Sequence, residues 1–252
     1  MKRILLILSA ILVYSGMARV AQAQTVVPDN LRAAMSLDRL GSTSGNRFAT
    51  DFVYGIPSPP GTVIGDYYMN PRWLNSSIVL YSVEKPIENY KTRYDIKLNE
   101  LEVKTADAVK VVPGMRIKSF AVYDSAEAKP RFYINARDFD TVDGNKLEGF
   151  FEVLEEGKAT LLKRMEVSIK KADYNATLAV GSRDDKILKK DVFYVLKDKR
   201  VEELRLQKKK IMPLFGDKAG QVQEMANKKG LSFSRQDHLE MIFAYYNKLA
   251  AN

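Results

Sequence analysis

Three aspartates come closest to a metal-binding spacing in this sequence. Asp138, Asp140 and Asp143 stand at near-alternate positions and are followed by Gly144 and Asn145. Carboxylate and amide oxygens gathered around a turn are ligands that Ca²⁺ prefers. The spacing differs from that of an EF-hand loop, and the glutamate expected near the end of such a loop is missing. The pattern therefore favours an Asp-Gly turn between two strands, with a calcium site as the alternative.

The same carboxylates are the best candidates for acid-base catalysis. A hydrolase of this kind would need at least two of them, or of Asp184 and Asp185, to converge in one cleft with shifted pKa values. The separation of a catalytic carboxylate pair is spatial and has no signature in the order of residues. Carboxylate-dependent hydrolysis is therefore an alternative, and we expect the chain not to be an enzyme.

Cysteine and histidine content excludes several other chemistries. The 252 residues include no cysteine and one histidine, which excludes a thiolate nucleophile, a disulfide, an iron-sulfur cluster and a multi-histidine metal site. The single imidazole, His238, lies beside Asp237 in the first turn of a predicted helix. We expect this side chain to be partly exposed, with a local role at most. No cofactor is expected.

Aromatic side chains gather in the first third of the predicted sheet. Core packing is the commoner use of such residues, but a cluster of this kind also lines ligand cavities in curved sheets. Residues 78–83 are a further candidate for lining such a cavity. Five aromatic residues are the candidates for binding an apolar ligand: Tyr67, Tyr68, Trp73, Tyr81 and Tyr94.

The charge balance is moderately basic. Lysine and arginine number 40 against 31 aspartate and glutamate residues, for a formal net charge of +9. The lysine pairs are scattered and none lies in an aromatic stacking motif, so nucleic acid is not expected as a partner. Solvated lysine faces are the favoured interpretation. Contact with an envelope protein or an anionic envelope surface, such as lipid phosphates, is the alternative.

The first residues have the pattern of an export signal. Lys2 and Arg3 precede an apolar run over residues 4–14, and Ala-Gln-Ala at 21–23 is a small-x-small cleavage site. We predict a signal peptide over residues 1–23 that is cleaved after Ala23. The apolar run is too short to span a bilayer, and no later stretch is long enough. The mature chain is therefore expected in the periplasm or cell envelope, without a transmembrane span.

Beyond the signal, the pattern changes from irregular to that of a sheet. Turn-forming residues dominate residues 24–64, which we predict to be an irregular arm lying on the main domain. Over residues 65–206 apolar side chains recur with a period of two, which is typical of strands. The clearest strand covers residues 164–170, where the odd-numbered side chains are apolar and the even-numbered ones are polar.

Turn signals indicate how these strands are connected. A change of parity near Asn99 requires a bulge or a tight turn. Short strands joined by tight turns pair antiparallel, so the sequence predicts a mainly β fold, either an antiparallel sandwich or a partly open barrel. The hairpin signals lie at residues 143–144, 155–158 and 198–199.

Residues 207–252 have the period of helices. Asp217 is predicted to cap a first helix that ends at Gly230, and Ser234 with Asp237 resembles a capping box for a second helix. The second helix is predicted to dock its apolar stripe on the sheet or on the first helix. That stripe consists of Leu239, Ile242, Phe243, Tyr246 and Leu249.

Four stretches of the sequence carry a resemblance to a known group. They are Gly65 with Tyr67 and Tyr68 ahead of Trp73, Tyr94-Asp95 followed by Asn99-x-Leu101-Glu102-Val103-Lys104, the run over residues 149–164, and the closing Tyr245-Tyr246-Asn247. From about residue 65 to the C-terminus, the chain resembles a group of uncharacterised exported proteins of Bacteroidota-type bacteria. The resemblance implies a Gram-negative host and a periplasmic or envelope location. It implies no activity, ligand or catalytic residue.

Three functions remain open at this stage. The favoured one is a non-catalytic, exported cell-envelope protein that binds another macromolecule, which predicts an exposed apolar patch or an unpaired strand edge. The alternative is a periplasmic carrier or sensor of an apolar small ligand, which predicts a cavity on the inner face of the sheet. The second alternative is the carboxylate-dependent hydrolase. The identity of the partner and the oligomeric state stay open.

Overall fold

The computed structural model describes residues 61–127, 129–175 and 178–251, without the side chain of residue 84. The chain divides into two units, Met1–Pro59 and Pro60–Asn252, and the described residues belong to the second unit. The predicted signal peptide, its cleavage site and the predicted arm up to residue 60 lie outside the described residues.

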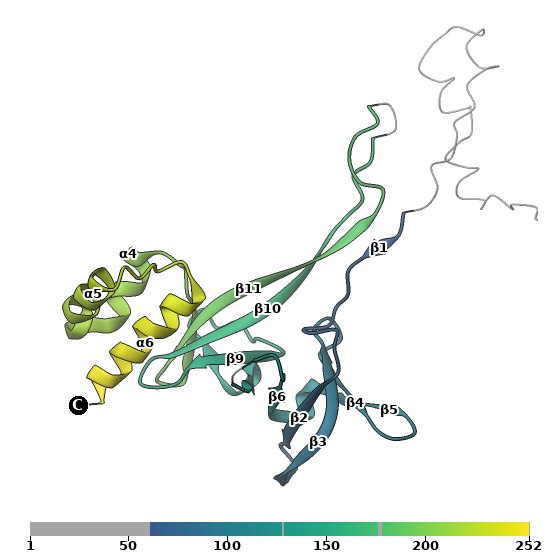
Figure 1. Cartoon of the computed structure of the whole chain (residues 1–252), viewed down its shortest axis with the longest axis horizontal. Coiled ribbons are helices and arrows are strands. Elements are labelled where there is room, and N and C mark those ends of the chain that lie inside the picture. The colour runs from purple at the N-terminus through teal and green to yellow at the C-terminus, as the bar shows by residue number, and fades with distance from the viewer. Residues whose placement is uncertain (1–60, 128, 176–177, 252) are drawn as a thin grey trace, which may run out of the picture. The chain divides into compact units, whose positions relative to one another are not determined.

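One sheet of twelve strands forms most of the second unit (Figure 1). Its order is β5-β4-β3-β2-β6-β7-β9-β10-β11-β12-β8, and β1 pairs with β11. The strands are β1 (Val63–Ile64), β2 (Leu74–Leu80), β3 (Val83–Asp95), β4 (Glu100–Lys104), β5 (Val109–Pro113), β6 (Ile117–Tyr123), β7 (Arg131–Asn135), β8 (Asp140–Thr141), β9 (Phe150–Glu155), β10 (Thr160–Lys170), β11 (Asp185–Lys197) and β12 (Arg200–Glu203).

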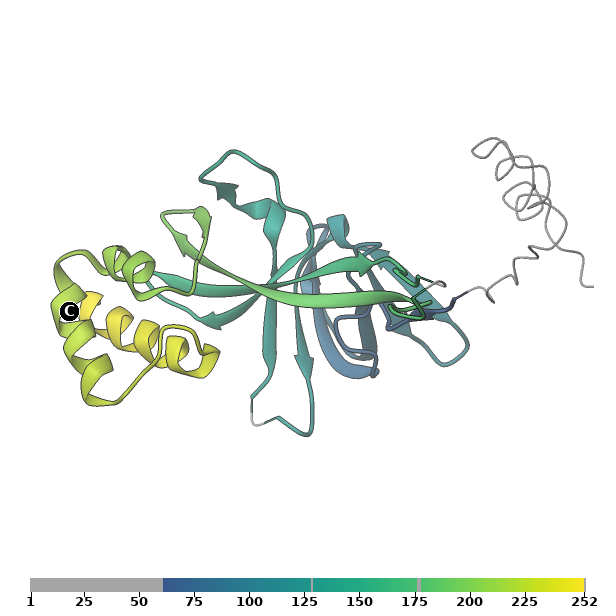
Figure 2. The same ribbon diagram turned by 90° about the horizontal axis from the view of Figure 1, so that it is seen from above.

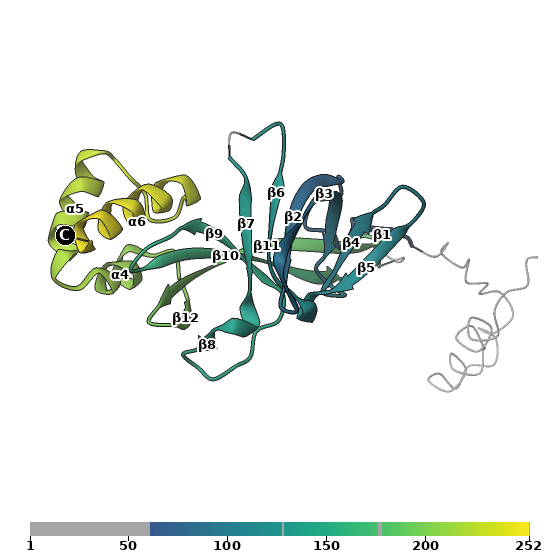
Figure 3. The same ribbon diagram turned by 90° about the horizontal axis from the view of Figure 1, so that it is seen from below.

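The sheet is mainly antiparallel and open. Only the pairs β1–β11 and β12–β8 are parallel, and the order ends at β5 and β8 without closing. Strands β6 and β7 run across the direction of β10 and β11, so the sheet is strongly twisted (Figures 2 and 3). The prediction of a mainly β, antiparallel and partly open fold with C-terminal helices is confirmed.

A single row of paired residues shows how the sheet is built. Directly paired residues of antiparallel strands project to the same face. The row is apolar at both ends, but an acid and a base stand in its middle. Across β2, β6, β7, β9, β10 and β11 it reads Ile78, Phe120, Tyr133, Glu152, Lys163 and Phe193.

The two apolar ends of this row belong to separate hydrophobic clusters. Around Phe120 the curled half of the sheet packs against itself, with Phe120 stacked on Tyr133 at 4.7 Å between ring centroids. Around Phe193 the sheet is covered by the C-terminal helices. Between the clusters Lys163 forms an ion pair with Glu152 at 3.0 Å. One face of one sheet therefore holds two cores separated by charge.

A third cluster lies on the opposite face of β9 to β12. There Phe151 packs edge-on against Tyr194, with ring centroids 5.0 Å apart. The chain from β7 to β9 covers this cluster with Phe139 and Leu147. Consecutive residues of β10 therefore serve different clusters, since Leu161 faces the helices and Leu162 faces the covering loop.

One sequence-based expectation about the connections is confirmed, because β3 ends at Asp95 and a tight turn, with Asn99 at a φ of 53°, leads into β4. A second expectation needs correction. Gly144 is in a turn at a φ of 78°, but the strands on either side of it are not partners. β8 pairs with β12 instead of β9, so residues 143–144 do not form a hairpin.

The C-terminal element contains the two predicted helices, α5 (Ala219–Lys228) and α6 (Gln236–Ala250). A short α4 (Lys208–Ile211) and η3 (Met212–Lys218) precede them. The predicted stripe of α6 is buried against the sheet and the other helices. In the part of the chain that the structure describes, no helix has both the length and the apolar character needed to cross a bilayer.

Both predicted N-terminal caps are wrong. Asp217 lies inside η3, and α5 begins after Lys218 without a side-chain cap. Helix α6 begins after Arg235, also without a side-chain cap. The Ser234 hydroxyl instead pairs with Ser232 at 2.7 Å. The same local turn uses the imidazole, because Nδ1 of His238 accepts the N–H of Ser232 at 2.8 Å.

Candidate functional site

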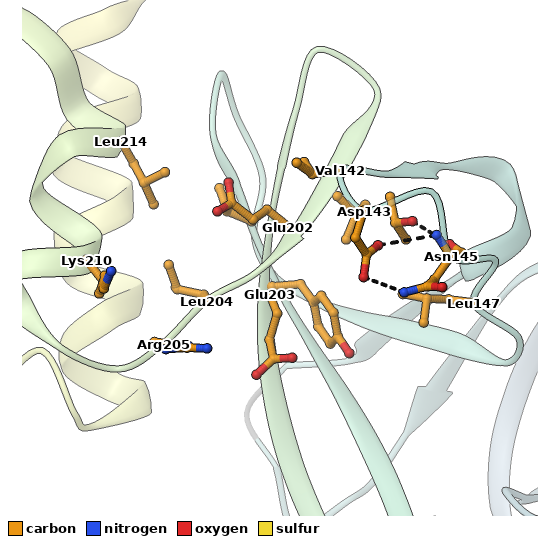
Figure 4. A pocket seen from close by; sticks show the side chains of 14 residues that line it. Val142, Asp143, Asn145, Leu147, Glu202, Glu203, Leu204, Arg205, Lys210 and Leu214 are labelled. Atoms are coloured by element: carbon orange, nitrogen blue, oxygen red, sulfur yellow. Dashed lines mark hydrogen bonds between the residues drawn. The ribbon is translucent and has the colours of Figure 1, made fainter.

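A hollow that contains the predicted site residue Asp143 lies beside the end strand β8. We call it the charged groove. It encloses about 550 Å³ between β12, the loop that follows β8, and the α4–η3 segment (Figure 4). Its 14 lining residues are Thr141, Val142, Asp143, Asn145, Leu147, Tyr194, Val195, Val201, Glu202, Glu203, Leu204, Arg205, Lys210 and Leu214.

Strand pairing determines which side chains reach this groove. Thr141 of β8 pairs with Val201 of β12, and the N–H of Val142 donates to the C=O of Val201 at 3.1 Å. This pairing places the loop after β8 along one side of β12. Leu204 is buried and belongs to the cluster under the helices, which places α4 and η3 along the other side. The groove therefore exists because the sheet and the helical element meet at β12.

Charged side chains stand at the rim of the groove without pairing. Glu202 and Glu203 come from β12, while Arg205 and Lys210 come from the connection to α4 and from α4 itself. Within the described ranges, none of these four side chains takes part in a salt bridge. Figure 4 shows Glu202 and Glu203 projecting from β12 in different directions. Both signs of charge are thus presented to solvent around an apolar floor.

Asp143 is the acidic residue of the groove whose carboxylate is held by hydrogen bonds from a neighbour in sequence. The amide of Asn145 donates to its carboxylate at 2.5 Å (Figure 4). Hydrogen bonding from Thr141, and then from Asn145, holds the pKa of Asp143 below its ordinary value. A carboxyl group with a lowered pKa is ionised at neutral pH and does not donate a proton. The geometry of Asp143 therefore favours a structural or binding role.

The other two aspartates of the predicted calcium turn lie apart from the groove lining. The Asp138 carboxylate accepts a hydrogen bond from the Tyr81 hydroxyl at 2.6 Å. Asp140 pairs through its backbone with Arg200. Across the described ranges, no three acidic or histidine side chains are close enough to hold a metal ion. Asp138 ends η2 (Ala136–Asp138), Asp140 begins β8 and Asp143 lies in the loop after β8, so the three aspartates belong to different local elements.

Asp184 and Asp185 lie at the far end of β11 from this region. Asp185 is the first residue of the 13-residue β11. Lys197, the last residue of β11, pairs with Arg200 of β12, and Arg200 in turn pairs with Asp140. At roughly 3.3 Å per residue the two ends of β11 are about 40 Å apart. Hydrogen bonds from Lys171 and Thr62 lower the pKa of Asp185 and Asp184 respectively. The five aspartates considered for hydrolysis therefore lie in at least two separate regions, at opposite ends of β11.

Two of the predicted aromatic residues enclose an arginine. The guanidinium carbon of Arg93 lies 4.0 Å from the ring centroid of Tyr68 and 4.5 Å from that of Trp73. Arg93 Nε donates to Glu102 at 2.6 Å, and the Tyr68 hydroxyl donates to the same carboxylate at 3.0 Å. Arg93 and Tyr68 thus share one carboxylate as hydrogen-bond acceptor, so we interpret the cluster as structural.

The remaining predicted aromatics lie in three different surroundings. Tyr94 is buried in the core, edge-on to Phe150 at 5.2 Å. Tyr81 lies at the surface beside Arg137, whose guanidinium is 5.0 Å from the ring centroid. Tyr67 lines a shallow groove that we call the Tyr67 groove. This groove encloses about 560 Å³ and is lined by Tyr67, Ile96, Lys97 and residues 164–169.

The inner face of the curled sheet is almost filled. Ile78, at the start of the run predicted to line a cavity, is buried in the cluster around Phe120. The hollow that remains inside has a volume of about 10 Å³. A space of this size holds one water molecule or ion and no apolar ligand.

Sequence inspection missed the four unpaired charges of the charged groove. Glu202 and Glu203 have the pattern of exposed edge residues, and Lys210 that of a solvated lysine run. The signal that could have found them is the dense alternation of charge and leucine over residues 202–210, where a strand passes into a helix.

Comparisons of the chain with protein-family models, with curated proteins and with solved structures found no significant match.

Proposed function

We propose that the protein is a non-catalytic, exported cell-envelope protein that binds another macromolecule through the charged groove. The observation that carries this proposal is the set of four unpaired charged side chains, Glu202, Glu203, Arg205 and Lys210, around an apolar floor. Charged side chains that a fold does not pair internally are available to steer and orient a partner. Export and location in the envelope rest on the signal-like N-terminus.

The position of the groove supports a macromolecular partner. Strand β8 is the last strand of the sheet order, and Val142, directly after it, is 62% exposed. A polar rim around an apolar centre is the usual composition of a protein interface. An end strand also offers main-chain groups to an incoming strand. A protein partner can therefore use side-chain and main-chain contacts in the same place.

Site-specific crosslinking in the native host tests the proposal. A photoreactive amino acid replaces Val142 in the full chain, and irradiation of intact cells is expected to give a discrete covalent adduct that mass spectrometry identifies. Leu178, which is 67% exposed on the β10–β11 connection, is the control position. Equal adducts at both positions, or none at Val142, would contradict a partner at the charged groove.

Charge reversal gives a second test that does not depend on the crosslinker. Glu202→Lys with Glu203→Lys is expected to abolish the Val142 adduct, because both carboxylates line the groove. The matched control is Glu156→Lys in the exposed turn between β9 and β10. Circular dichroism checks that all variants fold. An adduct that survives the double reversal would show that these charges do not contact the partner.

A carrier of an apolar small ligand is the second candidate function, and the Tyr67 groove favours it. Met165, Val167 and Ile169 alternate along β10 where they line this groove with Tyr67 and Ile96. Its volume lies in the range of small-molecule sites. Native mass spectrometry of residues 24–252 purified from the host is expected to show a bound mass that is lost in Val167→Asp. A bare protein mass would remove this candidate.

A further inference from the structure

Three buried polar atoms inside the curled half of the sheet have no hydrogen-bond partner among the described residues. They are Oγ1 of Thr92, Nε of Arg131 and the hydroxyl oxygen of Tyr133. Thr92 is 1% exposed and Tyr133 is 2% exposed. A buried polar group without a partner is costly, since it loses its hydrogen bonds to water and gains none. Three such atoms at one place call for a common explanation.

The three residues line one cavity, which is the hollow of about 10 Å³ on the inner face. They come from two strands that are not neighbours in the sheet order, so the curl of the sheet brings them to one hollow. Thr92 of β3 pairs with Leu74 of β2, whereas Arg131 and Tyr133 alternate along β7 and therefore share a face. The floor of the cavity is apolar, with Leu101 and Phe120 among its lining residues. The cavity thus combines a small polar spot with an apolar floor.

The chemistry of the three atoms selects the kind of group that would satisfy them. Arginine Nε–H can only donate, and the two hydroxyl groups can also donate. Burial raises the pKa of the Tyr133 phenol and the charge of Glu152 raises it further, whereas the nearby guanidinium of Arg131 opposes both effects. Tyr133 is therefore a neutral donor at physiological pH. A single acceptor atom can accept from all three.

The charged side chains that line the cavity are all basic and favour an acceptor with negative charge. Three arginines, Arg72, Arg93 and Arg131, line it, and none of its lining residues is acidic. Their acidic partners stand outside the lining: Arg72 is paired with Asp124, Arg93 with Glu102, and Arg131 with Glu127. These ion pairs hold the guanidinium groups in place. Arg131 uses a terminal nitrogen for Glu127, which leaves its Nε–H for the cavity.

We infer that this cavity is a binding site for one small anion of the size of chloride or bromide, held by Thr92, Arg131 and Tyr133. A volume of about 10 Å³ accommodates one such ion or one water molecule. The inference is independent of the proposed function. The anion would complete the core of the curled half, so its main effect is on the stability of that half.

Bromide substitution tests the site directly. Crystals of the mature protein grown in gluconate and soaked in sodium bromide are expected to show an anomalous peak within hydrogen-bond distance of the three atoms. The variant Thr92→Val with Tyr133→Phe removes two donors with little change of shape, and its crystals are expected to lack the peak. No peak in the wild-type protein, or the same peak in the variant, would overturn the inference.

Thermal unfolding in solution separates a specific site from a general salt effect. At constant ionic strength, replacement of gluconate by bromide is expected to raise the unfolding temperature of the wild type with the logarithm of bromide concentration. The double variant and Arg131→Lys are expected to lose this dependence, whereas Arg116→Lys, an exposed control, retains it. Equal dependence in every variant would mean an adventitious ion only. No dependence in the wild type would mean a bound water, and both results would overturn the inference.

Discussion

Asn247 of α6 holds the backbone of Ala159 through two hydrogen bonds. Its side-chain oxygen accepts the N–H of Ala159 at 3.0 Å, and its side-chain nitrogen donates to the C=O of Ala159 at 3.0 Å. Ala159 is fully buried in the turn between β9 and β10. This reciprocal contact attaches the last helix to the sheet.

We predict that Asn247→Asp destabilises the protein. The carboxylate cannot donate to the C=O of Ala159 and places negative charge against it. The free energy of unfolding is expected to fall by about 1–3 kcal/mol, the usual cost of an unsatisfied buried group, as measured by urea unfolding followed by circular dichroism. Gln223→Glu, the same chemical change at an exposed site of α5, is the control. Equal effects of the two changes would contradict this role.

The cluster around Arg93 has its own optical probe, because Trp73 is the only tryptophan in the chain. Arg93→Lys keeps the charge but loses the planar group between Tyr68 and Trp73. We expect a change in the tryptophan emission spectrum and a loss of about 0.5–2 kcal/mol in unfolding free energy. Arg116→Lys is the control, and an unchanged spectrum in Arg93→Lys would show that Trp73 does not depend on the guanidinium.

Glu155 is predicted to lower stability at neutral pH. Burial, and next the charge of Glu240, raises its pKa above the ordinary value of 4.5. The folded protein therefore favours the protonated carboxyl, and this stabilisation is complete below pH 4.5 and is lost as pH rises through the folded-state pKa. Glu155→Gln should raise the urea midpoint at pH 7 and should not raise it at pH 3. Glu156→Gln, at an exposed neighbour, serves as the comparison, and a gain at both pH values would rule out a titration effect.

Asp66 is predicted to act with the opposite sign. Its hydrogen bond with Lys189, 2.8 Å between Nζ and Oδ1, is the first cause of a pKa below 3.8. Stability from this group is present above pH 3.8 and is lost as pH falls through the lower folded-state pKa. Asp66→Asn should therefore lower the urea midpoint at pH 6 and have little effect at pH 2. Asp107→Asn in an exposed turn provides the reference, and equal losses at both pH values would contradict the prediction.

The sequence was sufficient to predict the strands and helices whose residue pattern is local. Met165, Val167 and Ile169 alternate in period two because β10 has two distinct faces, and the stripe from Leu239 to Tyr246 has helical period because α6 docks on one side. These signals predicted the mainly β class and the two helices. Both predicted caps are wrong because each helix begins one residue later than predicted, after Lys218 and after Arg235, and neither residue caps the helix with its side chain.

The candidate site depended on relationships that have no local signal. The charged groove exists because β8, a strand of two residues, lies parallel to β12 some 60 residues later in the chain. Nothing in Asp140 or Thr141 indicates that pairing. In the same way, Tyr68 and Trp73 have the pattern of ligand-binding aromatics, and only the pairing of the residues around them with β3, at Asp95 and Thr92, places Arg93 between them.

The ion pair of Glu152 and Lys163 in the middle of an apolar face has a mechanical consequence. Few apolar contacts cross that line on this face, so the cluster around Phe151 on the opposite face carries the apolar packing between the helical half and the curled half. This face therefore has a seam, and hydrogen exchange should show two cooperative units with different opening free energies on either side of it. A partner that pulls on the charged groove would exert force on the helical half and leave the fold around Phe120 intact.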